Sequence, residues 1–113
     1  MIVDKLQSLL ADQIVLLVNS GKVGLGGNST FSSQTGLDIE LANATSASAT
    51  KSDENVVQVK VSISGGGTLA GQVLREVGVF DGSSNMLIRQ NFDGIGPFAS
   101  NETVEFFIFL EVE

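Results

Sequence analysis

The stretch LREVGVFDGSSNMLIRQNF at residues 74–92 decides how the rest of this chain is interpreted. Its first arm, residues 74–80, is rich in β-branched and aromatic residues, and its second arm, residues 86–92, is again mostly apolar. Between them DGSSN, residues 81–85, gathers residue types that form turns. Two strand-like segments joined by such a loop predict a β-hairpin.

Alternation along this hairpin predicts which side chains meet. Glu76, Gly78 and Phe80 share one face of the first arm, and Arg75 lies on the other. In an antiparallel hairpin Glu76 comes near Arg89 of the second arm, so we predict a cross-strand pair that fixes the register with about 0.2–1 kcal/mol. Gly78 has no side chain to pack, which predicts a bulge or the close approach of another group.

The hairpin resembles a pattern in the N-terminal regions of tail-fibre and tail-collar proteins of tailed viruses, and in small virion proteins related to them. In that group a strand of the form E-[VI]-G-[VL]-F is followed by an Asp/Gly turn and by a strand that carries an Arg. The matching positions here are Glu76, Val77, Gly78, Val79, Phe80, Asp81, Gly82, Met86, Leu87 and Arg89. Those proteins also begin with a helix and a short strand that ends in Gly-x-Gly, so the resemblance covers most of the chain and is weakest over residues 43–52. It implies a module that docks a fibre or adaptor onto a tail or baseplate.

Length and composition predict a single domain over residues 1–113 with a modest core, since 42% of the residues are hydrophobic. The chain contains no Cys and no His, which excludes disulfides, thiolate metal sites and Ser-His-Asp or Cys-His catalytic sets. We therefore expect no cofactor, no metal and no enzymatic activity. The net charge of −7 without a basic cluster argues against nucleic acid and against an anionic membrane surface. No apolar run approaches the roughly 20 residues of a membrane span, and the acidic N-terminal stretch does not resemble a signal peptide.

A helix is predicted over residues 4–19, with Asp4 and Gln7 forming a capping box and Gly21 ending it. Its apolar stripe comprises Val3, Leu6, Leu10, Ile14 and Leu17, widened by Leu9 and Val18. We expect this stripe to cover one side of a sheet. The alternative is a helix that binds a membrane surface or a partner, and its acidic residues disfavour the membrane.

The middle of the chain predicts further strands. Residues 22–28 (KVGLGGN) follow a helix and lack a Lys-Ser/Thr ending, so a short strand with a tight corner is favoured over a phosphate-binding loop. Residues 37–41 predict a short extended segment, and the Ala/Ser/Thr-rich residues 43–52 predict an exposed loop. Residues 57–63 alternate apolar and polar as a half-buried strand does, and the glycines at 65–67 end it.

The last strand is predicted over residues 103–113, after a loop at 93–102. One face of that strand is apolar throughout and belongs to the core, whereas Phe107 and Phe109 stand between glutamates on the other. Either the N-terminal helix covers these two side chains or another subunit does, because an uncovered Phe pair on a strand would promote aggregation. Phe98, Phe107 and Phe109 are the candidate interface residues.

No constellation of reactive groups stands out in the sequence. Residues 81–85 superficially resemble a calcium loop but lack the later Glu of an EF-hand, so a plain turn is favoured. Glu111 and Glu113 share a face of the last strand about 7 Å apart, a spacing that could suit an acid/base pair. Terminal glutamates more often provide solubility, and we favour that role.

The sequence thus predicts an α+β fold in which the N-terminal helix packs on an antiparallel β-sandwich or curved sheet of about five to seven strands. The predicted function is that of a virion structural protein: a tail, baseplate or tail-fibre attachment component assembled in the host cytoplasm, or alternatively a capsid decoration protein. Expected partners are copies of the chain itself, with a trimer as the first expectation, and other virion proteins. A carbohydrate-binding β-sandwich is the alternative from another class, disfavoured because the chain has no Trp or Tyr for sugar stacking.

Overall fold

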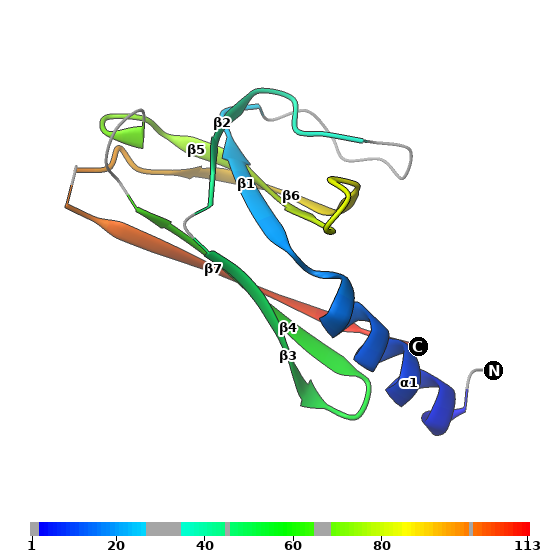
Figure 1. Cartoon of the computed structure of the whole chain (residues 1–113). Helices are drawn as coiled ribbons and strands as arrows, with labels where there is room; N and C mark the ends of the chain where they lie inside the picture. Colours follow the sequence, from blue (N-terminus) through cyan, green and yellow to red (C-terminus); the bar gives the residue numbers. More distant parts are fainter. Residues whose placement is uncertain (1–2, 27–34, 45, 65–68, 100) are drawn as a thin grey trace.

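The described part of the chain folds into one helix and two antiparallel sheets (Figure 1), as the α+β prediction requires. The computed structural model describes residues 3–26, 35–44, 46–64, 69–99 and 101–113. Helix α1 spans Asp4–Leu17. The strands are β1 (Ser20–Gly24), β2 (Glu40–Asn43), β3 (Ser46–Asp53), β4 (Val56–Ser64), β5 (Leu74–Phe80), β6 (Met86–Ile95) and β7 (Thr103–Glu111).

The first sheet has the strand order β2-β1-β5-β6 and the second has the order β3-β4-β7. A single core cluster joins them, and its fully buried members include Val23, Val77 and Val79 from the first sheet and Val57, Val59 and Val61 from the second. The rings of Phe92 on β6 and Phe106 on β7 meet across the sheets with centroids 5.1 Å apart. The hairpin β5–β6 therefore shares its core with the last strand of the chain.

The strand predicted over residues 57–63 is confirmed as β4, which alternates buried valines with outward polar side chains. β4 is the central strand of its sheet, paired with β3 on one side and with β7 on the other. The predicted short strand within residues 22–28 corresponds to β1, and the extended segment predicted from Leu37 becomes a strand only at Glu40. The glycines at 65–67 lie outside the described residues.

The prediction of an exposed loop over residues 43–52 is wrong, because most of it forms strand β3. β3 pairs with β4 from Ser46↔Ser62 to Asp53↔Val56. Ala47 and Ala49 point inward and are half-buried against the core. The small side chains carry little strand signal of their own, and the valine-rich β4 supplies the partner that the sequence pattern could not reveal.

Helix α1 ends at Leu17 rather than at Asn19, and the predicted capping box is wrong. Val3 is the N-cap residue, and its carbonyl oxygen accepts the first hydrogen bonds of the helix from the N–H groups of Leu6 and Gln7. Among the residues that the structure describes, no side chain caps this terminus. Asp4 is instead the first helical residue, where its charge favours the positive end of the helix dipole.

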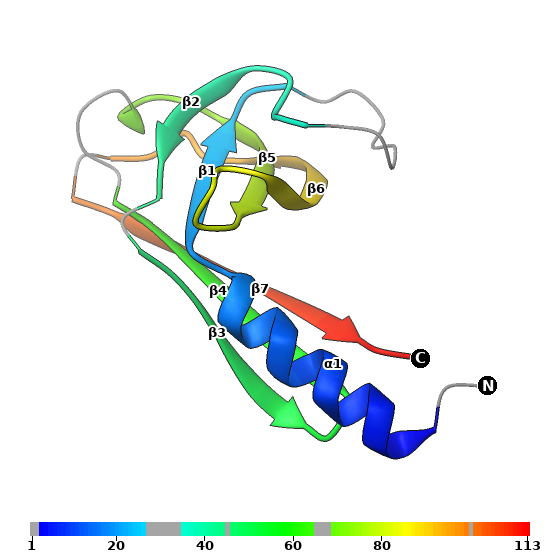
Figure 2. The same ribbon diagram turned by 45° about the vertical axis from the view of Figure 1, so that its right-hand side comes forward.

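Helix α1 buries only part of the predicted apolar stripe: Ile14 and Val18 pack against the core, and the other stripe residues are exposed. It lies against β3 and β4 (Figure 2), and Ala11 is its fully buried residue. Lys51 of β3 donates to the hydroxyl of Ser8 at 2.7 Å and pairs with Asp12 at 3.1 Å. The inward side chains of β3 are alanines and this lysine, and they contact Ser8 and Ala11 of the helix. Much of the apolar stripe is therefore left exposed.

Substitution of Val59 tests the shared core. We expect Val59→Ala to lower the free energy of unfolding by about 1–3 kcal/mol, because it leaves a cavity at a fully buried position in the central strand. Urea unfolding measures the loss, and Gln58→Ala, on the outward side of β4, serves as the matched control with an expected change under about 0.5 kcal/mol. Equal losses in both variants would contradict the described facing of β4.

Candidate functional site

The carboxylate of Glu76 lies at the centre of the first sheet and is fully buried. Its Oε2 accepts hydrogen bonds from the backbone N–H of Gly26 at 2.7 Å and of Ile39 at 3.0 Å. Its Oε1 accepts from the backbone N–H of Asp38 at 2.9 Å. The carboxylate thereby joins β5 to the backbone that follows β1 and to the backbone that leads into β2.

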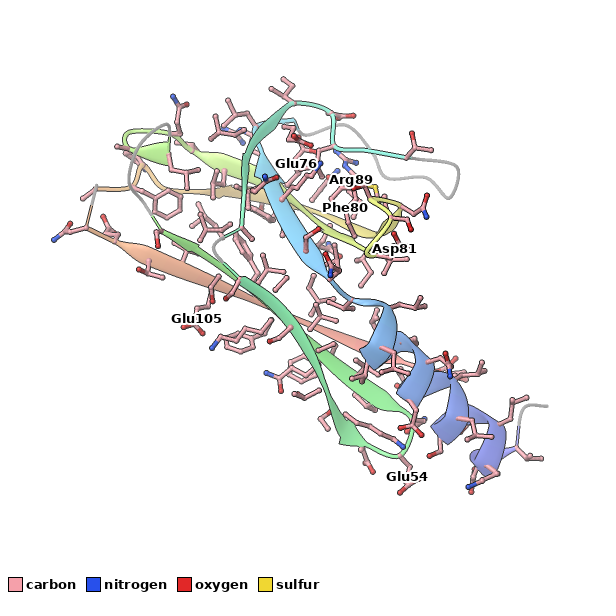
Figure 3. All side chains as sticks on the ribbon, in the orientation of Figure 1. Glu54, Glu76, Phe80, Asp81, Arg89 and Glu105 are labelled. Carbon is pink, nitrogen blue, oxygen red and sulfur yellow. The ribbon has the colours of Figure 1, made fainter. Side chains whose placement is uncertain are left out.

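Arg89 completes this cluster from β6 (Figure 3), which confirms the predicted pairing of Glu76 with Arg89. Its Nε and Nη2 each lie 3.1 Å from Oε1 of Glu76, and Nη2 also lies 3.1 Å from Oδ2 of Asp38. The residue directly opposite Arg89 is Gly78, so the pair forms diagonally across the hairpin. Both side chains are buried, so breaking this ion pair costs more than the about 0.2–1 kcal/mol that the sequence predicts for a cross-strand pair.

Two glycines of the Gly-x-Gly segment leave the space that this carboxylate occupies. A Cβ atom on Gly24 or on Gly26 would lie 2.6 Å from Oε2 of Glu76 and would also collide with residue 38 or 39. The sequence predicts only a tight corner at these glycines, and no local pattern connects them, or Asp38, with Glu76. The signal that could have found the cluster is the joint presence of Gly-x-Gly after the first strand and of a Glu–Arg pair in the hairpin.

The other hairpin residues support the same sheet. Leu37 approaches Gly78 so closely that a Cβ there would lie 3.0 Å from its Cδ2, which confirms the predicted close approach. Phe80 is buried, with the ammonium group of Lys22 4.7 Å from its ring centroid. Arg75 is exposed and donates to the carbonyl oxygen of Asp93 at 3.1 Å.

Asp81 organises the turn between β5 and β6. Its Oδ1 accepts the backbone N–H groups of Ser83 and Asn85, both at 2.9 Å, and its Oδ2 accepts the side-chain amide of Asn85 at 3.1 Å. The backbone N–H of Asn85, followed by its side-chain amide, lowers the pKa of Asp81 below the usual range of an aspartate. Because the N–H of Ser83, two residues after Asp81, donates to its Oδ1, the loop has the geometry of an Asx-type turn. Gly82 is exposed within this turn.

The three candidate interface phenylalanines differ in their surroundings. Phe98 is 7% exposed and belongs to the core, so it has almost no surface to contribute and we withdraw it from the candidate interface. Phe107 and Phe109 are 51% and 63% exposed on the outward face of β7. Of the two alternatives that the sequence left open, coverage by α1 is wrong, because the helix lies on the inward side of the same sheet.

The described part of the chain brings no three His, Cys, Asp or Glu side chains together in a group that could hold a metal ion. Within it, no helix combines the length and apolar character that crossing a membrane requires. Glu111 and Glu113 are both exposed at the end of the chain. Both oxygens of the Glu76 carboxylate accept hydrogen bonds from the chain itself, which suits a structural role.

Comparison of the chain with protein-family models, with curated proteins and with solved structures gave no significant match. The resemblance to virus tail proteins therefore stays a prediction from the motif residues.

Replacement of Glu76 tests the cluster. Glu76→Gln removes the charge that pairs with Arg89 and turns an NH₂ group toward backbone donors, so we expect a loss of about 3 kcal/mol in the free energy of unfolding. Denaturant unfolding gives the value. Glu54→Gln, at an exposed position in the β3–β4 turn, is the matched control and should change stability by less than about 0.5 kcal/mol. A Glu76→Gln protein as stable as the parent would refute the structural role of the carboxylate.

The turn at Asp81 predicts a pH dependence. Because its pKa is lower in the folded chain than in the unfolded one, ionised Asp81 stabilises the fold above the unfolded pKa of about 3.9, and this contribution is lost as the pH falls through the folded pKa. NMR titration of the Asp81 carboxyl carbon should give a midpoint below that of an unfolded aspartate. A midpoint at or above the unfolded value would contradict the described hydrogen bonds.

Proposed function

We propose that this chain is a virion structural protein of a tailed virus: a small β-sandwich module of the tail, baseplate or tail-fibre attachment. It acts by binding copies of itself and neighbouring virion proteins, and its location is the virion. The motif residues that resemble tail proteins support the proposal. Glu76 and Arg89 form one buried cluster with Gly24 and Gly26. The motif residues therefore act together in holding the strands of one sheet.

The observation that carries the proposal is the exposed pair Phe107 and Phe109. Both lie on β7, which is paired with β4 along one side from Ser64↔Thr103 to Val56↔Glu111. No strand in the described ranges pairs with the opposite side of β7. An edge strand that exposes two phenylalanines would promote aggregation unless another protein surface covers it.

The surroundings of the pair suit a specific contact. Lys60 is the cross-strand neighbour of Phe107, and its ammonium group lies 3.4 Å from Oε2 of Glu105. An apolar centre bordered by polar groups is the usual composition of a protein interface. Burial of the remaining surface of each phenylalanine would contribute about 1–2 kcal/mol to binding.

Incorporation into particles tests this function. We expect particles of the virus that encodes the chain to carry it in symmetric copies on the tail or baseplate, visible by electron cryomicroscopy. The double variant Phe107→Gln/Phe109→Gln should fold, since both side chains already face solvent, but should be incorporated at least about tenfold less. Ser83→Ala, in the exposed β5–β6 turn, is the control and should be incorporated normally.

A chain absent from the particle, or one found on the capsid alone, would refute the tail assignment. Normal incorporation of the double phenylalanine variant would refute the role of the β7 face.

A further inference from the structure

One side of helix α1 is apolar and uncovered in the folded chain. At 100° per residue, one arc of about 140° on the helix contains every exposed leucine of α1 together with Val3. Its apolar members are Val3, Leu6, Leu9, Leu10, Leu16 and Leu17. The exposed fractions run from 38% for Leu10 to 76% for Leu16. We call this surface the apolar arc.

Gln13 is the one polar residue within the apolar arc. The charged residues of the helix lie outside it: Asp12 pairs with Lys51 of β3, Asp4 lies on the side of the helix opposite the arc, and Lys5 lies beside the arc. A helix face without charges has no electrostatic means of selecting a charged partner. A second apolar helix face fits it, and the same arc on another copy of the chain has that chemistry.

Residue spacing in the apolar arc matches packing between like helices. Val3, Leu6, Leu10, Gln13 and Leu17 are separated alternately by three and four residues, which is the a/d spacing of a coiled-coil seam. A single polar residue at such a seam fixes register and orientation, because it must meet a polar partner. Parallel helices place Gln13 opposite Gln13 of the second copy, whereas antiparallel helices place it against a different layer.

The helix is already ordered for such an association. A helix as short as Asp4–Leu17 is marginal alone in water. Here the packing of Ala11 and the contacts of Lys51 with Ser8 and Asp12 hold it against the sheet. Association therefore needs little further ordering of the backbone.

An apolar groove continues the arc at the C-terminal end of the helix. It has a volume of about 260 Å³ and is lined by Ile14, Leu17, Val18, Leu87, Ile88 and Leu110. Figure 2 shows the β5–β6 turn above this end of α1. Leu87 and Ile88 follow that turn, as the second and third residues of β6. The groove gives an incoming leucine side chain a concave apolar site.

We propose that copies of this chain associate through the apolar arcs of parallel α1 helices, with Gln13 side chains paired at the seam and apolar side chains of one copy entering the groove of the next. The inference names the surface through which copies bind one another, and it rests on the proposed function, in which the chain assembles in a virion. The surface is separate from the Phe107–Phe109 face of β7, so the two can be tested apart.

Self-association of the full chain is the first test. Sedimentation of the parent protein up to about 100 µM should show a concentration-dependent oligomer, and Leu6→Gln/Leu10→Gln should weaken it at least about tenfold. Both leucines are exposed, and circular dichroism should confirm that the variant keeps its fold. Ile39→Gln/Ile95→Gln is the matched control, with two apolar side chains exposed away from α1 and β7, and should retain the oligomer.

Cross-linking tests the orientation, since the chain has no native cysteine. Gln13→Cys should give an interchain disulfide under a mild added oxidant, because parallel packing brings the two introduced thiols together. Lys5→Cys, outside the arc, should give much less at the same concentration.

A parent protein that stays monomeric, or a leucine variant that assembles as well as the parent, would overturn the α1 inference. Failure of Gln13→Cys to cross-link would overturn the parallel seam. A monomer does not by itself remove the chain from a tail, which is judged by the particle experiment, so the two proposals can fail separately.

Discussion

The burial of Glu76 is the constraint on which the first sheet depends. A carboxylate without solvent must be matched by donors, and here three backbone N–H groups and Arg89 provide them. Those donors come from three separate parts of the chain and the carboxylate from a fourth, so the cluster ties β5 and β6 to the ends of β1 and β2. The glycines at 24 and 26 follow from the same requirement, because a side chain at either position would occupy the space of the carboxylate.

The inward surface of the second sheet determines which side of α1 packs against it. Its inward surface is formed by valines on β4 but by alanines and Lys51 on β3. The helix meets this surface with Ala11 and Ser8, and Lys51 draws Asp12 to the same side. The leucines of the helix then remain in solvent, although a sequence pattern alone would place them in the core.

In the part of the chain that the structure describes, the apolar arc of α1 and the Phe107–Phe109 face of β7 are uncovered apolar surfaces on separate elements. Both lie on regular secondary structure, so the backbone fixes where their side chains begin. The titratable groups, in contrast, serve the fold: Glu76 and Arg89 hold the sheet, and Asp81 holds a turn. This division favours a protein whose activity is contact with other protein surfaces.

Local patterns of period, turn residues or charge suffice to predict the hairpin, the Glu76–Arg89 contact, the half-buried strand β4 and the N-terminal helix. Three features follow instead from packing: residues 46–53 form a strand, Phe98 is buried, and α1 packs around Ala11 with its leucines exposed. Ala and Ser carry weak strand preference, and a helix with several apolar positions offers more than one face. The partner surfaces decide such cases, and a single stretch of sequence does not contain them.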